Sequence, residues 1–250
     1  MRSPCRVAAV ACAVLLLPAT AAAQPQDGAG GLSLTTLLAL GALSLLPFLL
    51  MTATSFVKLS IVLSVLRNAF GAGQVPSGAI ITAFAAILTA YVMAPVWSQI
   101  TEVAAAPSAR VDLNDPLRGE SRSALLEAID RGKEPVREFL LRNSGERERG
   151  LFLRLARDAR PADERADVTE RDLMVALPAF LITELAEAFQ IAFFVLLPFL
   201  ILDLVIASIL AALGLFTLPS ASVSLPFKLL LFVLADGWYV LSEALVAGYT

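Results

Sequence analysis

The sequence predicts an all-α membrane protein, in which about four long apolar helices form hairpins around a polar helical insert. Apolar residues make up 58% of the 250-residue chain and the mean hydropathy is +0.77, whereas a soluble domain is about 45–50% apolar. Of the 19 basic and 22 acidic residues, 29 lie between residues 110 and 172. Three long runs contain no charge, and about 20 consecutive apolar residues are enough to cross a bilayer. These runs are residues 28–57, 68–101 and 204–227.

The first segment, residues 1–23, has the form of a secretory signal peptide. It starts with two arginines, continues with an apolar core at residues 7–17 and ends in three alanines that match an A-x-A cleavage site. We therefore expect the mature chain to begin at Gln24. Both cysteines, Cys5 and Cys12, lie in this segment, and the chain contains no histidine. Without a thiol nucleophile, a Cys/His zinc site or a histidine base, we expect no catalytic residue, no metal ion and no cofactor.

The N-terminal membrane block, residues 24–106, contains three apolar stretches that we expect to be helical. They are residues 32–54, 56–70 and 79–100, and a turn-rich segment at residues 71–78 separates the last two. Pro95 interrupts the third stretch. Lys58 and Arg67 lie nine residues apart in the second stretch, so they share roughly one helix face.

The polar insert, residues 107–172, carries charges of both signs. Its 14 basic and 15 acidic residues between positions 110 and 172 are typical of a solvated helical surface and not of a nucleic-acid site. Apolar residues recur at helical spacing in residues 123–143 and again in residues 151–156. We therefore expect two or three short helices, followed by a linker at residues 161–167.

The C-terminal membrane block, residues 173–250, is again apolar, with a break at residues 214–224. Its apolar stretches are residues 173–187, 188–218 and 225–249. A cleaved signal peptide places the mature N-terminus outside the cytoplasm, and the excess of positive charge at Lys58 and Arg67 favours the cytoplasmic side for the first break. This topology gives four crossings and places the polar insert in the periplasm.

Seven ionisable residues lie inside the apolar stretches, where an unpaired charge is costly. They are Lys58, Arg67, Glu184, Glu187, Asp203, Lys228 and Asp236. One interpretation is an ion-coupled transporter, with Asp203, Asp236 and Lys58 as the relay. The other is that these charges pair within the protein or between subunits and hold an assembly in register.

An intramembrane enzyme is a third interpretation, and the residue types argue against it. Asp203 and Asp236 lack the Gly-x-Gly-Asp setting of intramembrane aspartyl proteases. Glu184 and Glu187 lack the histidine that di-metal carboxylate helices use.

Three ordered groups of motifs give the chain a family resemblance over roughly residues 35–250. The first is TSFVKLSIVLSVLRNAFG at 54–71, with QVP at 74–76 and YVMAPV at 91–96. The second is LPAF at 177–180, LPF at 197–199 and DLVIAS at 203–208, and the third is SLPFKL at 224–229 with FVLADGW at 232–238. In this order the motifs resemble the FliP/SctR family, the main export-gate subunit of type III secretion systems.

The resemblance implies a structural subunit of a protein channel in the bacterial inner membrane, within the basal body of the secretion apparatus. Five copies would wind into a helical cone with small FliQ/SctS-like subunits and one FliR/SctT-like subunit, next to a FlhB/SctU-like switch protein. Unfolded secreted proteins would pass through this cone. The charges in the apolar stretches would then pair between subunits, and no nucleic acid would be involved.

Two departures from the family pattern concern the branch and the gate. The sequence Phe56-Val57-Lys58 favours the injectisome branch, because flagellar members typically have Phe-Thr-Arg at these positions. The signal peptide, by contrast, favours the flagellar branch. The family carries a methionine run after the Asp203 helix, which forms a flexible gasket that closes the pore. The matching positions here are Leu215, Phe216 and Thr217, so we expect a stiffer pore gasket at these residues.

Overall fold

The computed structural model describes residues 51–71, 76–111 and 119–249, together with Gly41, Ser44, Leu45, Pro47 and Phe48. The predicted signal peptide, with its cleavage site before Gln24, lies outside the described residues. The chain divides into two compact units, Met1–Met51 and Thr52–Thr250. Every element named below belongs to the second unit.

Within its described residues the second unit is built of helices, and no strand occurs among them. The elements are α3 (Phe56–Ala69), α4 (Gly78–Ser108), α5 (Gly119–Arg142), α6 (Glu146–Asp158), the short 3₁₀ turn η1 (Arg165–Asp167), α7 (Leu173–Ala212), α8 (Ser220–Leu234) and α9 (Gly237–Ala247). The all-α prediction is confirmed, and the polar insert forms α5, α6 and η1.

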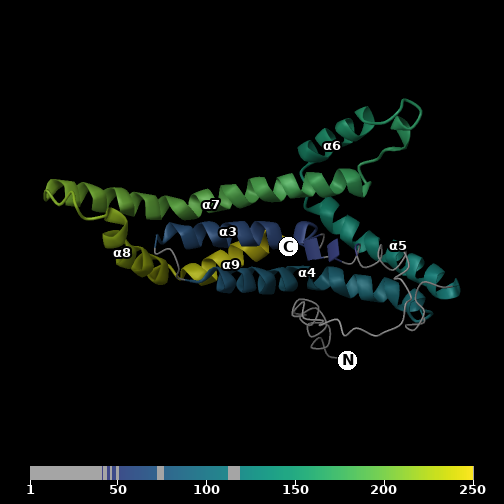
Figure 1. The fold of residues 1–250 in the computed structure, drawn as a ribbon, viewed down its shortest axis with the longest axis horizontal. Coiled ribbons are helices and arrows are strands. Elements are labelled where there is room, and N and C mark those ends of the chain that lie inside the picture. Colours follow the sequence, from purple (N-terminus) through teal and green to yellow (C-terminus); the bar gives the residue numbers. More distant parts are fainter. Residues whose placement is uncertain are drawn as a thin grey trace, which may run out of the picture. The chain divides into compact units, whose positions relative to one another are not determined.

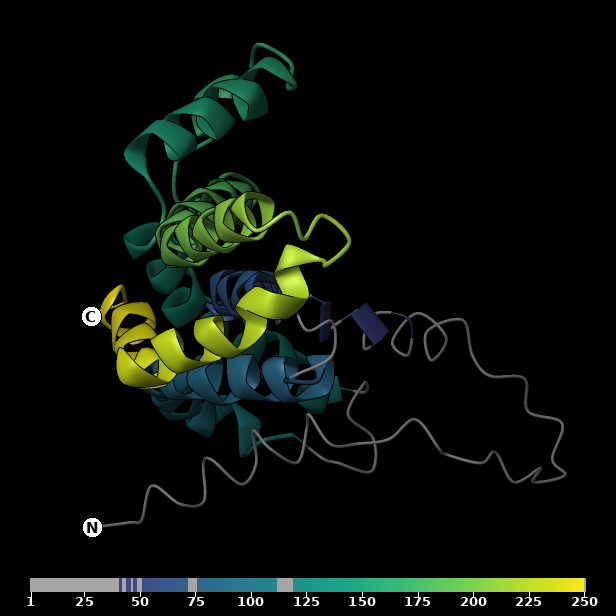
Figure 2. The same ribbon diagram turned by 90° about the vertical axis from the view of Figure 1, so that its left-hand side faces the viewer.

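Helix α3 lies between α7 and α4, as both ribbon views show (Figures 1 and 2). Helix α9 contacts α4, α5 runs along α4 and reaches α7, and α6 lies on the side of α7 away from α3 (Figures 1 and 2). The polar insert therefore packs on both membrane blocks and forms part of the second unit.

The main core forms around α3 because one stripe of this helix is completely buried. Leu59, Val62, Leu63 and Leu66 follow the i, i+3, i+4, i+7 spacing of a single helix face, and each has 0% exposure. Full burial of such a side chain stabilises the fold by about 1.5–3 kcal/mol. Phe70 closes the stripe, with its ring 5.4 Å from the ring of Phe199 on α7 and 5.3 Å from that of Phe232 on α8. These contacts fix α3 as the centre of the unit.

Helices α4 and α7 are longer than the sequence suggested. The predicted helix at 79–100 extends through Pro95 to Ser108, and the stretch 173–187 continues through residues 188–212 of the next stretch as the single 40-residue helix α7. Proline removes one backbone hydrogen bond, but the remaining bonds of a long apolar helix keep it continuous, since no competing partner for the backbone is available among apolar side chains. Both helices are long and apolar enough to cross a membrane.

The last apolar stretch was predicted as one segment, and that expectation was wrong. Residues 225–249 are divided between α8 and α9, which meet at an angle of 61°. Asp236 sits at the break in the left-handed conformation, with φ of 50°. A Cβ on Gly237 would lie 2.2 Å from a ring atom of Phe232. The Asp-Gly pair therefore makes a turn where its flanks favour a helix.

The described residues thus contain two helices able to span a membrane, or three if α8 and α9 together form one broken span. The predicted topology had four crossings, and its first apolar stretch, residues 32–54, lies mostly outside the described residues.

Candidate functional site

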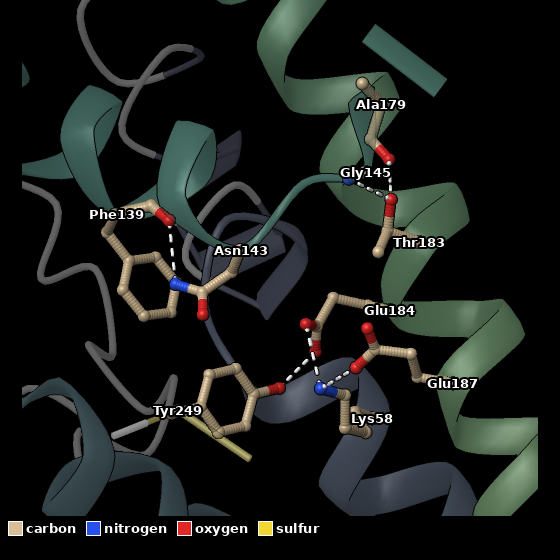
Figure 3. Close-up of polar contacts among 9 residues, drawn as sticks. All are labelled: Lys58, Phe139, Asn143, Gly145, Ala179, Thr183, Glu184, Glu187 and Tyr249. Atoms are coloured by element: carbon tan, nitrogen blue, oxygen red, sulfur yellow. Dashed lines mark hydrogen bonds and ion pairs between the residues drawn. The ribbon is translucent and has the colours of Figure 1, made fainter. Parts of the chain in front are cut away.

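The first polar site, the Lys58 cluster, consists of Lys58, Glu184, Glu187 and Tyr249 (Figure 3). The Nζ atom of Lys58 lies 3.1 Å from Oε1 of Glu184 and 2.6 Å from Oε2 of Glu187. The side chains of Lys58 and Glu184 are only 2% and 1% exposed, whereas that of Glu187 is 48% exposed. The hydroxyl of Tyr249 donates to Oε2 of Glu184, and Nζ of Lys58 lies 4.2 Å from the centre of the tyrosine ring. Two carboxylates and one ring thus surround a single buried ammonium group.

Three chain segments build this cluster. Lys58 comes from the first turn of α3, whereas Glu184 and Glu187, three residues apart, share a face of α7. Tyr249 follows the last helix and packs in a core with Phe139 and Phe180, its ring 6.0 Å from that of Phe139. The charges of Lys58 and Glu184 are both buried away from water. Removing either charge would leave the other buried and unpaired, at a large cost in stability.

The loop between α5 and α6 approaches the cluster from the insert (Figure 3). The backbone N–H of Gly145 donates to Oγ1 of Thr183 over 2.9 Å, and that hydroxyl donates to the carbonyl of Ala179 over 2.9 Å. A pocket of about 200 Å³ opens between this loop and the cluster. The polar side chains that line it are Lys58, Arg142, Asn143, Ser144, Thr183, Glu184 and Glu187. The insert is therefore hydrogen-bonded to the membrane block at the residue that directly precedes Glu184 of the buried pair.

The second polar site, the Lys228 cluster, consists of Asp203, Ser224, Lys228 and the carbonyl group of Ala69. Nζ of Lys228 lies 2.8 Å from Oδ2 of Asp203 and donates to the carbonyl of Ala69 over 2.8 Å. Oγ of Ser224 donates to Oδ1 of Asp203 over 2.6 Å. One ammonium group therefore ties the end of α3 to α7 and α8, at the wall of an open pocket of about 330 Å³.

The remaining predicted residues lie elsewhere. Nε of Arg67 donates to the carbonyl of Pro76 over 2.9 Å, which closes the connection from α3 to α4. Asp236 is exposed at the break between α8 and α9. Leu215, Phe216 and Thr217 are exposed in the connection from α7 to α8 and belong to neither cluster.

The structure therefore unites Lys58 with Glu184 and Lys228 with Asp203, while the three members of the relay hypothesis belong to three separate places. Nothing in the described part of the chain gathers three or more acidic side chains in a way that would hold a metal ion. The contacts favour a mechanical role, in which buried ion pairs fix helices against one another.

Sequence reasoning missed three members of these sites. Ser224 lies four residues before Lys228, and this spacing places both on one helix face, so the motif SLPFK contained the signal. Thr183 precedes Glu184 directly but carried no pattern of its own. Tyr249 lies 65 positions from Glu184 along the chain, and no local spacing predicts a contact at that distance.

Comparison with known proteins gives a consistent result. Residues 39–245 match the model of the FliP family. The chain is 40% identical over 220 residues to pathogenicity-related ORF2 of Xanthomonas campestris pv. glycines, covering 88% of this chain and 97% of that protein. It is 41% identical over 208 residues to the hypersensitivity response secretion protein HrcR of Ralstonia nicotianae, covering 83% and 93%. It is 42% identical over 218 residues to the flagellar biosynthetic protein FliP of Pectobacterium carotovorum, covering 87% and 79%.

Proposed function

The chain belongs to the FliP family, and on that premise we propose that it is a structural subunit of the export gate of a type III protein secretion system. The match over residues 39–245 carries this proposal, because it includes the ion pairs Lys58–Glu184 and Lys228–Asp203 and every helix from α3 to α8. The subunit acts as part of a conduit for unfolded secreted proteins and performs no chemistry of its own. It resides in the bacterial inner membrane.

The apolar surface of a single copy supports an assembly. Large apolar side chains along α7 are more than half exposed, including Phe189, Phe193, Phe194, Ile201 and Leu204. A soluble monomer rarely exposes a continuous apolar patch of this kind, so lipid or neighbouring subunits must cover it. We propose that five copies and smaller helical subunits of the FliQ/SctS and FliR/SctT type cover most of it, next to a FlhB/SctU-like switch protein.

We propose that Leu215, Phe216 and Thr217 form the pore gasket. Phe216 is 80% exposed and lies in the connection between α7 and α8, so its ring is free to meet equivalent rings of neighbouring copies. Phenylalanine and leucine exclude water and ions as methionine does, but they adapt less readily to varied cargo. This gasket would therefore be tighter and stiffer than a methionine gasket.

We assign the subunit to an injectisome, with a flagellar export gate as the second candidate. Phe56-Val57-Lys58 and the relatives named for pathogenicity and hypersensitivity secretion support the injectisome. The flagellar relative is as similar, at 42% identity, and keeps the second candidate open.

Complementation tests both candidates. The chain is expressed in one strain that lacks its HrcR-type subunit and in another that lacks FliP, and secretion of the respective substrates is measured. The injectisome assignment predicts restored secretion in the first strain and none in the second. The reverse pattern would assign the chain to the flagellum, and failure of both, with the chain present in the membrane, would argue against an export-gate subunit.

A further inference from the structure

Asp236 is a charged residue between the apolar helices α8 and α9, and the described part of the subunit provides no partner for its carboxylate. Lys58 and Lys228 are engaged in the two clusters, and Arg67 is bonded to the backbone at Pro76. In the described ranges, by contrast, no ion pair or hydrogen bond involves the side chain of Asp236, and the residue is exposed. The carboxylate stands at the N-cap position of α9 and yet makes no capping hydrogen bond.

The position of Asp236 makes this unusual. Helices α8 and α9 meet at 61°, so the chain bends and continues and does not reverse as in a solvent-exposed hairpin. Together the two helices are long and apolar enough to form one broken span, and Asp236 falls sixteen residues after the start of α8 and eleven before the end of α9. A carboxylate in the interior of a span is costly unless a partner neutralises it.

The backbone conformation at Asp236 makes it possible to test the negative charge of this residue separately from its role in the turn. At φ of 50° Asp236 is in the left-handed region, which only glycine, asparagine and aspartate adopt readily. The turn itself therefore requires only one of these three residue types. It does not require a negative charge, so the charge needs a separate explanation.

The surroundings show what kind of surface the carboxylate belongs to. Apolar side chains on both sides of the break are mostly exposed, namely Leu230, Val233, Leu234, Tyr239 and Val240. Trp238, which is 41% exposed, packs on the rings of Phe84 and Phe232, with 5.8 and 5.1 Å between ring centres. The bend thus exposes apolar side chains on both sides of one acidic residue, and we call these five side chains with Asp236 the bend surface.

We propose that the bend surface docks an apolar helix of a different subunit of the secretion apparatus, and that one lysine or arginine of this helix pairs with Asp236. This inference rests on the proposed function and adds the chemistry of one partner. An apolar surface with a single carboxylate is complementary to an apolar helix with a single cation, and such a desolvated pair also fixes register. A second copy of this chain is a poorer match, because the cations of its described apolar helices, Lys58, Arg67 and Lys228, are already engaged.

The test uses Asp236→Asn, because asparagine keeps the left-handed backbone and removes only the charge. Glu243→Gln is the matched control, since Glu243 is an exposed carboxylate on the same helix α9, four residues before its end. The full chain is co-expressed with the subunits encoded beside it, and the amount of detergent-extracted complex and the helical content of the chain alone are measured. We expect Asp236→Asn to lower the yield of complex at least about tenfold, which corresponds to the loss of one pair of about 1.4 kcal/mol, while the helical content stays unchanged. Glu243→Gln should leave the yield within about twofold.

A suppressor selection then identifies the partner. Asp236→Lys should abolish secretion, and the proposal predicts that revertants change a lysine or arginine in an apolar helix of another subunit to an acidic or neutral residue. Normal assembly of Asp236→Asn would overturn the proposal, as would revertants confined to the polar insert of this same chain, which would point to a second copy. A yield of the unmodified chain that falls to that of Asp236→Asn when sodium and potassium are removed would point to a bound cation and overturn it as well. If the unmodified chain itself forms no complex, the proposed function fails together with this inference.

Discussion

Removal of the buried ammonium group by Lys58→Met should destabilise the subunit strongly. Methionine is unbranched like lysine and only one heavy atom shorter, so the substitution removes the charge with little change in packing. Glu184, with a side chain only 1% exposed, would be left without its cation, with the hydroxyl of Tyr249 as its remaining close polar partner. The carboxylate of Glu187 next to it would add to the cost of leaving it charged.

The magnitude follows from the burial of the pair. Breaking a buried ion pair from one side costs about 3–5 kcal/mol. For a chain of about this size, 1 kcal/mol shifts Tm by about 2–4 °C. Lys58→Met should therefore lower Tm by roughly 6–20 °C, measured by circular dichroism on the detergent-extracted chain.

The double variant Lys58→Met/Glu184→Gln separates charge from packing. Glutamine still accepts a hydrogen bond from Tyr249 but carries no charge, so at least half of the lost Tm should return. Lys133→Met is the surface control, because Lys133 pairs with the exposed Asp130 and holds the pKa of its carboxyl below the usual range. That variant should melt with the unmodified chain, since exposed pairs contribute little. The reasoning is refuted if Lys58→Met melts within 2 °C of the unmodified chain, or if the double variant is less stable than the single one.

Three further predictions test other parts of the structure. Tyr249→Phe removes a hydrogen bond to a buried carboxylate and keeps the ring over the ammonium group, so it should cost about 1.5–3 kcal/mol and lower Tm less than Lys58→Met does. Gly237→Ala should lower Tm sharply, because the new Cβ would lie 2.2 Å from a phenyl ring of α8, whereas Gly132→Ala on α5, with 3.7 Å to the nearest side-chain atom, should raise Tm slightly. Replacement of Leu215 and Phe216 by glycine should make membranes that contain the assembled gate leak ions, measured as conductance or dye uptake, and unchanged permeability would refute the gasket.

The fold could be predicted from the sequence wherever the spacing of apolar residues is compatible with only one type of secondary structure. The long runs of α4 and α7 and the amphipathic repeats of α5 and α6 allowed only helices, so element type followed from periodicity. The ends were less certain, since Pro95 read as a break in the sequence but is accommodated within the continuous helix α4. The bend at Asp236 was missed because here a single Asp-Gly pair does interrupt the helix, although the apolar residues on both sides favour a continuous one.

The site could be predicted only in part, because the spacing of residues along the chain indicates contacts only between residues that are close in sequence. The charges in the apolar stretches singled out Lys58, Glu184, Asp203 and Lys228 as residues that need partners. Which carboxylate meets which ammonium group depends on how α3, α7 and α8 pack, and 126 positions separate the two residues of the buried Lys58–Glu184 pair. The contribution of Tyr249 depends on the final turn of the chain reaching back to α7, which no local pattern contains.

The export-gate assignment is tested most directly by the mass of the detergent-extracted complex when the chain is co-expressed with the subunits encoded beside it. The assignment predicts a stable complex with about five copies of this chain and several small helical partners, in which the apolar faces of α7 and α8 are covered. A monomer or dimer that binds none of these partners, although it is folded and present in the membrane, would contradict the assignment and return attention to transport by a small oligomer.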